Sequence, residues 1–130
     1  MASDIAQRFI DALHTLEADR TADALAELYA DDAKVGNIAT TRTYDGPDGA
    51  KEFWTGYREA FGDIRSEFRN VVSDDGAALL EWESKGTVAN GDDIVYEGVT
   101  VLEVSGDRIT RSTAYFDPRA IVEHLSGVSA

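Results

Sequence analysis

The sequence predicts an α+β domain in which three N-terminal helices pack in a curved antiparallel sheet, with a short helix at the C-terminus. Three observations predict this class. Apolar residues follow helical spacing in the first half, strand-like patterns fill the second half, and turn residues separate the strands. A chain of 130 residues can close one core, so we expect a single domain over residues 1–130. A curved sheet around helices would form a cone-shaped α+β barrel with a cavity inside.

Two helices are expected at the start of the chain. Apolar side chains three and four positions apart predict the first over residues 3–18, with Ser3 as its N-cap. Thr21 can cap a second, shorter helix that ends at the acidic pair of residues 31 and 32. The apolar face of that second helix would consist of Leu25, Leu28 and Tyr29.

The third helix is the most strongly patterned segment. Pro47 suits its first turn, where a missing N–H costs nothing, and Gly62 marks its end. The stripe between them has clear helical spacing and consists of Ala50, Phe53, Trp54, Tyr57 and Phe61. Residues 34–44, which precede this helix, are rich in β-branched side chains and are predicted to be extended.

Four strands are expected in the second half, joined by turns rich in Asp, Asn and Gly. They span residues 64–72, 77–88, 94–104 and 108–116. Turns of this chemistry connect consecutive hairpins, so the sheet is predicted to be antiparallel. Asp117 and Pro118 then open a short helix that stops at Gly127.

Charge and composition exclude several kinds of partner. The 12 Lys and Arg against 25 Asp and Glu give a net charge of −13, which would repel nucleic acid and anionic membranes. No apolar stretch approaches the roughly 20 residues of a membrane span. The first residues lack the basic region of a secretory signal, so a cytoplasmic protein is expected. The acidity is typical of a well-solvated surface, with salt adaptation as the alternative.

Metal and thiol chemistry have little support in the sequence. The chain has no cysteine, which excludes disulfides, a thiol nucleophile and thiolate metal sites. Its two histidines, His14 and His124, lie at opposite ends, so one subunit cannot assemble a histidine-rich metal site. A carboxylate-only Mg²⁺ or Ca²⁺ site stays open, although no EF-hand spacing appears. We expect no metal site and no cofactor.

Four segments together resemble the nuclear transport factor 2-like superfamily, and the SnoaL-like polyketide cyclase branch in particular. They are Leu-Tyr-Ala-Asp-Asp-Ala at 28–33, Tyr-Asp-Gly-Pro to Phe-Trp at 44–54, the strand 79–86 around Trp82, and 106–117 ending in Tyr-Phe-Asp. The resemblance covers nearly the whole chain. It implies a cofactor-free isomerase, cyclase or hydratase for a small apolar cyclic or polyketide-like molecule. The alternative is a non-catalytic ligand-binding or protein-interaction module, because the superfamily hosts both.

The catalytic residues of several related families are missing. The tyrosine, aspartate and acidic donor of ketosteroid isomerases fall at positions similar to Phe9, Asn37 and Thr100, which cannot perform those roles. Limonene epoxide hydrolases use an Arg-x-Asp pair that a gapless count places at Glu81 and Glu83. Alternation with Leu80 and Trp82 instead predicts that these glutamates face water. Scytalone dehydratase relies on paired histidines, which this chain lacks.

Asp117 is the candidate acid or base. SnoaL-type cyclases, by resemblance, use an aspartate near the end of the last long strand, and Asp117 is the matching position. Alternation puts it on one face with Tyr115 and Thr113. If that face lines the cavity, burial would raise the pKa of Asp117 and suit it to proton transfer, with Tyr115 as hydrogen-bond donor. The alternatives are an N-cap, whose backbone hydrogen bonds would lower that pKa, and a buried structural carboxylate.

Aromatic side chains are the candidates for the wall of a binding site. A pocket for a flat apolar ligand could be lined by Trp54, Tyr57, Trp82 and Tyr96, with Thr113 as a further substrate-binding residue. The alternative for Trp54 is a place in the core. We also expect a homodimer, as the resemblance implies, paired through the open face of the sheet. Strands that are apolar on both faces support it, through Val99, Val101 and Leu102.

Overall fold

The computed structural model describes residues 2–39 and 42–120. Its helices are α1 (Ala2–Asp19), α2 (Asp23–Ala26) and α3 (Gly46–Glu59). Its strands are β1 (Tyr29–Asn37), β2 (Tyr44–Asp45), β3 (Phe61–Ser73), β4 (Ala77–Val88), β5 (Asp93–Ser105) and β6 (Arg108–Phe116). The predicted α+β class is confirmed, and β4 and β6 have the predicted bounds. Within the described residues no helix is both long and apolar enough to cross a membrane.

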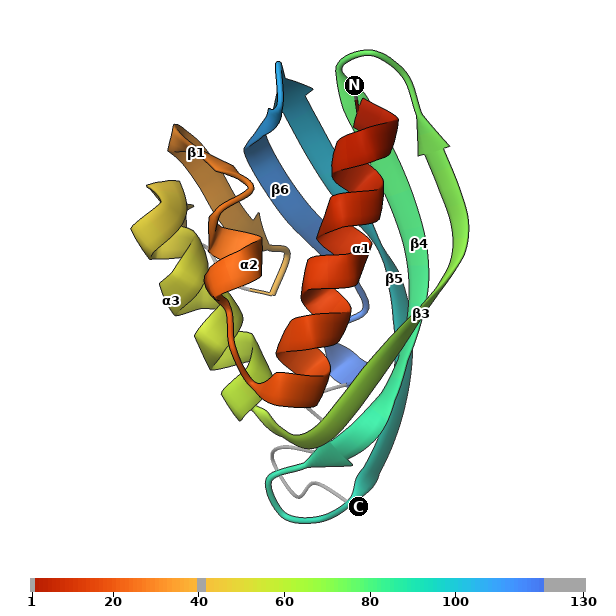
Figure 1. The fold of residues 1–130 in the computed structure, drawn as a ribbon. Helices are drawn as coiled ribbons and strands as arrows, with labels where there is room; N and C mark the ends of the chain where they lie inside the picture. The colour runs from red at the N-terminus through yellow and green to blue at the C-terminus, as the bar shows by residue number, and fades with distance from the viewer. Residues whose placement is uncertain (1, 40–41, 121–130) are drawn as a thin grey trace.

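The strands form one sheet in the order β2-β1-β6-β5-β4-β3. From β3 to β6 each strand pairs antiparallel with the next, as the turn residues predict. The sheet as a whole is mixed, because β1 pairs with β6 in parallel. That pairing joins segments far apart in the chain, so no hairpin turn in the sequence could predict it. The sheet curves around α1 and stays open at its edge strands, with α3 beside β1 (Figure 1).

The second helix is shorter than expected. α2 ends at Ala26 and the chain enters β1 at Tyr29, so Asp31 and Asp32 lie in a strand and do not end a helix. The Tyr29 ring is buried, and its hydroxyl lies 2.8 Å from Oγ of Ser112 on β6. Pairing with β6 therefore outweighs the weak helical pattern of this segment.

Two apolar clusters fill the space between the helices and the sheet. The larger contains the apolar face of α1, including Phe9 and Leu16. The smaller lies beside the end of α3 and contains Phe61, Trp82 and Tyr96. Along β4 the buried residues alternate with partly exposed ones, so Glu81 and Glu83 point away from the core, as predicted. The cavity described below is bordered by both clusters.

The described chain ends soon after β6. The N–H of Ala120 donates to the carbonyl oxygen of Asp117 at 3.1 Å, which is the turn that an Asp-Pro start predicts. The rest of the predicted C-terminal helix, with His124 in it, lies outside the described residues.

Candidate functional site

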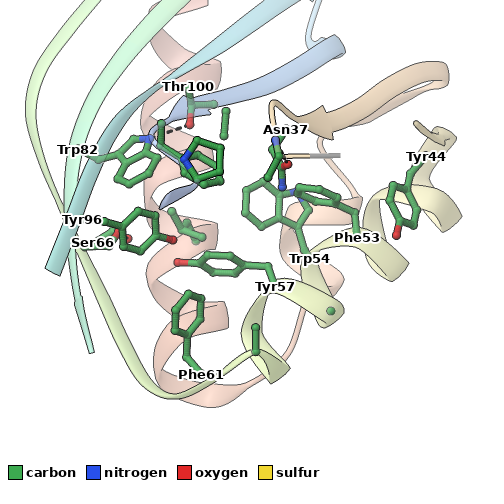
Figure 2. A pocket seen from close by; sticks show the side chains of 18 residues that line it. Asn37, Tyr44, Phe53, Trp54, Tyr57, Phe61, Ser66, Trp82, Tyr96 and Thr100 are labelled. Atoms are coloured by element: carbon green, nitrogen blue, oxygen red, sulfur yellow. Dashed lines mark hydrogen bonds between the residues drawn. The ribbon is translucent and has the colours of Figure 1, made fainter. Parts of the chain in front are cut away.

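A cavity of about 420 Å³ lies between α3 and the inner face of the sheet. Its wall is mainly aromatic. Phe53, Trp54 and Tyr57 come from the stripe of α3, because their spacing turns all three side chains toward the sheet. Trp82 of β4 and Tyr96 of β5 face them across the cavity (Figure 2). Such a wall suits a flat, mainly apolar molecule.

The rings of the wall hold one another in place. Tyr57 contacts Trp54 edge to face, with ring centroids 5.4 Å apart, and Tyr96 contacts Trp82 at 5.2 Å. Phe116 of β6 extends the second pair at 5.6 Å from Tyr96. A Cβ at Gly98 would come within 2.9 Å of the Trp82 ring, so glycine lets the indole lie against β5. These contacts make the cavity a preformed one.

The polar end of the cavity is organised by Glu17, a carboxylate of α1 that is only 5% exposed. Its Oε1 accepts the backbone N–H of Ser66 at 2.9 Å. Its Oε2 accepts the Ser66 hydroxyl at 2.6 Å and the Tyr57 hydroxyl at 3.0 Å. Oγ of Ser66 also lies 2.6 Å from Oγ of Ser84. A hydrogen-bonded network therefore connects α1, α3, β3 and β4, and Tyr57, Ser66 and Ser84 carry it to the cavity wall.

Arg58 fixes the backbone around this network. The side chain is buried, and its Nε donates to the carbonyl oxygen of Glu17 at 3.0 Å. Its Nη1 donates to the carbonyl oxygen of Phe61 at 3.0 Å, and its Nη2 to that of Gly62 at 3.2 Å. The guanidinium thus joins the end of α1 to the start of β3, and these bonds satisfy much of a buried charge.

The two tyrosines at the polar end keep their protons at neutral pH. Burial raises the pKa of Tyr57 well above its ordinary value, and Tyr96 and Glu17 raise it further. Burial, and after it the charge of Glu17, also raises the pKa of Tyr96. Thr100 lies four residues further along β5, beyond the Trp82 ring, and its Oγ1 accepts the indole N–H of Trp82 at 2.9 Å (Figure 2). Hydroxyl groups are therefore the main polar groups at this end of the cavity.

The predicted site residues fall into two groups. Trp54, Tyr57, Trp82 and Tyr96 lie on the wall of the cavity. Thr113, Tyr115 and Asp117 do not line it. Asn37 and Thr100, at the positions compared with ketosteroid isomerases, are wall residues, whereas Phe9 is buried against Trp54.

β6 alternates as expected, but the face opposite to Asp117 lines the cavity. Ala114 and Phe116 point inward, whereas Tyr115 is 41% exposed on the outer face. Oδ1 of Asp117 accepts the backbone N–H of Arg119 at 3.0 Å, and the carboxylate pairs with the Arg119 guanidinium. Hydrogen bonds from Arg119 lower the pKa of Asp117, as an N-cap would, whereas the acid/base hypothesis required a raised one. An acid or base acting in the cavity has to come from another residue.

Thr113 has the same orientation as Tyr115. Its hydroxyl accepts a hydrogen bond from Nη1 of Arg111 at 2.8 Å, and Arg111 pairs with Glu103 of β5 at 2.6 Å. A polar cluster on the outer face of the sheet therefore holds this side of β6. Thr113 therefore does not line the cavity, in contrast to the expectation from the sequence.

Reasoning from the sequence missed Glu17. The residue follows Leu13 by four positions and Leu16 by one, so it lies on the apolar stripe of α1. A single acid on a buried stripe is the signal that could have found it.

The described residues hold no group of three or more His, Cys, Asp or Glu that could bind a metal ion.

Comparisons with known proteins find a matching family model and solved structures of the same fold. A family model described as SnoaL-like domain matches residues 6–112. A comparison with curated proteins finds no match. Among solved structures, TerC co-crystallised with polyporic acid is similar, with 16% identity, a TM-score of 0.80 and coverage of 94% of this chain and 98% of TerC.

Two further solved structures show the same similarity. A protein with a ketosteroid isomerase-like fold from Catenulispora acidiphila DSM 44928, in complex with trimethylamine, has 14% identity and a TM-score of 0.81, over 95% of this chain and 93% of its own. A proposed SnoaL-like polyketide cyclase from Jannaschia sp. CCS1 has 14% identity and a TM-score of 0.81, over 96% and 91%. At such identities the likeness shows the fold alone.

Proposed function

Because the chain belongs to the SnoaL-like domain family, we propose that it is a cofactor-free enzyme acting on a flat, mainly apolar cyclic or polyketide-like compound. One observation carries the proposal. An aromatic cavity ends in hydroxyl groups that are hydrogen-bonded to the buried carboxylate of Glu17. The reaction class is isomerisation or ring closure, since both can begin with proton removal beside a carbonyl group.

The cavity has the size and surface for such a compound. Its volume of about 420 Å³ lies in the range of small-molecule sites. Trp54 and Tyr57 on one side and Trp82 and Tyr96 on the other offer aromatic surface for a planar ring. The polyporic acid bound to TerC and the cyclase role proposed for the Jannaschia protein support a ligand of this kind.

Proton removal would run through Tyr57. Its Oη would take a proton from the carbon beside the carbonyl group while its own proton passes to Oε2 of Glu17, 3.0 Å away. The electron pair of the broken C–H bond would form an enolate. The Tyr96 hydroxyl would donate to the enolate oxygen, and its raised pKa keeps that donor protonated. Returning the proton at another carbon gives isomerisation, and attack of the enolate on a second carbonyl group gives ring closure.

A binding module without chemistry is the second candidate. Among the described residues of the wall, tyrosines alone carry a titratable side chain. Glu17 reaches the cavity only through its hydrogen bonds to Tyr57 and Ser66. If a proton cannot pass through Tyr57, the same cavity would bind a ligand and leave it unchanged.

Hydrogen exchange separates the two candidates without knowledge of the natural substrate. The probe is α-tetralone in deuterium oxide, followed by proton NMR at the carbon beside its carbonyl group. We expect exchange above the buffer rate, reduced roughly a hundredfold by Tyr57→Phe, which removes the relay oxygen. Tyr115→Phe makes the same change on the outer face and should leave the rate unaltered. Binding without exchange would favour the binding module, and absence of both would overturn the proposal.

We also propose a homodimer paired through the outer face of the sheet. Leu79 is 45% exposed there and is paired with the partly exposed Val101 on β5, and the partly exposed Val99 lies two residues further along that strand. Tyr115 of β6 lies opposite Val99 and adds apolar surface. Leu102 takes no part in this face, because its side chain is fully buried in the core.

A further inference from the structure

The protons of the Glu17 network can be assigned one by one. A hydroxyl group has one proton to donate. The Ser66 hydroxyl donates its proton to Glu17 at 2.6 Å, so it cannot also donate to Ser84. The 2.6 Å contact between the two serines must therefore be a donation from Ser84 to Ser66. The Tyr57 hydroxyl likewise donates its proton to Glu17.

This assignment fixes what the network presents to the cavity. Tyr57 and Ser84 both line the wall, and both use their protons toward Glu17. Their oxygens can only accept hydrogen bonds from a molecule in the cavity. The edge of the cavity formed by the oxygens of Tyr57 and Ser84 is therefore an acceptor edge. It accepts hydrogen bonds only because both protons are directed toward the Glu17 carboxylate.

Two other hydroxyls of the wall have the opposite polarity. Oγ1 of Thr100 already accepts the Trp82 indole N–H, so its own proton is available for donation. Tyr96 keeps its proton, and Figure 2 shows its hydroxyl pointing toward that of Tyr57. A donor and an acceptor thus lie next to each other at the polar end of the cavity.

We propose that Glu17 sets this polarity, and that the cavity thereby selects flat cyclic compounds that carry both a hydroxyl group and a carbonyl oxygen. The ligand hydroxyl donates to Tyr57 or Ser84, and the ligand carbonyl accepts from Tyr96. This inference rests on the proposed function and names its substrate class. Glu17 acts here as a positioning residue, because it orients Tyr57 and Ser84 and does not itself line the cavity.

Glu17→Gln should reverse the acceptor edge. The amide oxygen can still accept the Ser66 backbone N–H, while the amide nitrogen donates where Oε2 accepted. Tyr57 and Ser66 then have to turn their protons away from residue 17. The Tyr57 hydroxyl would point into the cavity, and Ser66 would donate to Ser84, which frees the Ser84 proton for the cavity. The edge becomes a donor edge with nearly unchanged shape.

The test compares ligands that differ in one hydrogen-bonding group. β-Naphthol can donate, whereas β-methoxynaphthalene can only accept, and both affinities follow from quenching of tryptophan fluorescence. The preference for β-naphthol over β-methoxynaphthalene, measured as the ratio of the two dissociation constants, should fall about tenfold between the wild-type protein and Glu17→Gln, because the ether gains a hydrogen bond while the naphthol only exchanges a donated bond for an accepted one. Glu67→Gln, the same change on an exposed residue next to Ser66 on β3, should leave the ratio unaltered. Tyr96→Phe should weaken α-tetralone relative to tetralin, which lacks the carbonyl group.

The outcomes separate this inference from the proposed function. If the wild-type protein binds none of these probes, the binding site itself is wrong and the inference falls with it. If the probes bind but the ratio is the same in the wild-type protein and Glu17→Gln, Glu17 does not set the polarity and only the inference is overturned. Should Glu17→Gln fail to fold, the double variant Tyr57→Phe with Ser84→Ala decides the matter. It keeps the ring and removes both acceptors of the edge, so an unchanged preference for β-naphthol would equally overturn the inference.

Discussion

Replacing Glu17 with methionine removes the central hydrogen-bond acceptor of the polar network while keeping the length of the side chain. Three donated hydrogen bonds lose their acceptor: the Ser66 backbone N–H, the Ser66 hydroxyl and the Tyr57 hydroxyl. The two hydroxyls can rotate toward Ser84 or the cavity, but the backbone N–H cannot. One stranded buried donor costs about 1 to 3 kcal/mol, and each displaced hydroxyl about 1 more. Relief from burying a charge offsets part of this sum, so we expect a loss of roughly 2 to 4 kcal/mol.

Urea denaturation followed by circular dichroism measures this loss. With a slope of about 2 kcal/mol per molar urea, the midpoint of Glu17→Met should fall by roughly 1 to 2 M. Glu17→Gln is the matched control, because its amide oxygen can still accept the Ser66 N–H, and its midpoint should fall by less than half as much. If Glu17→Met is as stable as the wild-type protein, the network does not hold the helices and strands together and the reasoning is refuted.

Four further expectations follow from the same structure. Burial raises the pKa of Tyr29 to about 12, from an ordinary value of 10.0. The stability that the protonated Tyr29 contributes is therefore present below pH 10 and is lost as the pH rises through about 12. Tyr29→Phe has no proton to lose there, so it should flatten the alkaline fall in the free energy of unfolding. Leu79→Glu should convert the expected dimer to a monomer in sedimentation, and a wild-type monomer at micromolar concentration would contradict the dimer. Asp117→Asn can still cap and should change neither the urea midpoint nor ligand affinity; a loss of affinity would restore Asp117 to the site. With a net charge of −13, the melting temperature should rise with added NaCl, and a flat profile would count against self-repulsion.

The parts of the fold that local patterns control could be predicted from the sequence. Residues 77–88 and 108–116 form strands with the predicted bounds, because turn residues flank each of them. The third helix begins at Gly46, as Gly46-Pro47 predicts, but it ends at Glu59, so Phe61 lies on β3 and not on the helix. The parallel pairing of β1 with β6 could not be predicted, since it depends on contacts between Tyr29–Asn37 and a segment far along the chain.

Only the part of the candidate site that local patterns control could be predicted from the sequence. Aromatic spacing on α3 identified Trp54 and Tyr57, because the same helical period decides which residues face the sheet. Alternation showed that Asp117 and Phe116 belong to opposite faces of β6, but alternation alone does not say which face is inside. Packing decided that question in favour of Phe116. Glu17 was missed because an acid on a helix is ordinarily read as exposed.

The most direct test of the binding cavity uses the two tryptophans of the chain. Trp54 and Trp82 both lie on its wall, and their indole N–H groups donate to Tyr29 at 3.1 Å and Thr100 at 2.9 Å. A proton–nitrogen correlation spectrum shows one signal from each indole, and Trp54→Phe assigns them. On titration with α-tetralone we expect both signals to shift and to saturate with one dissociation constant. If neither indole signal moves while the probe stays in solution, the cavity does not bind a flat cyclic ketone and the central claim is contradicted.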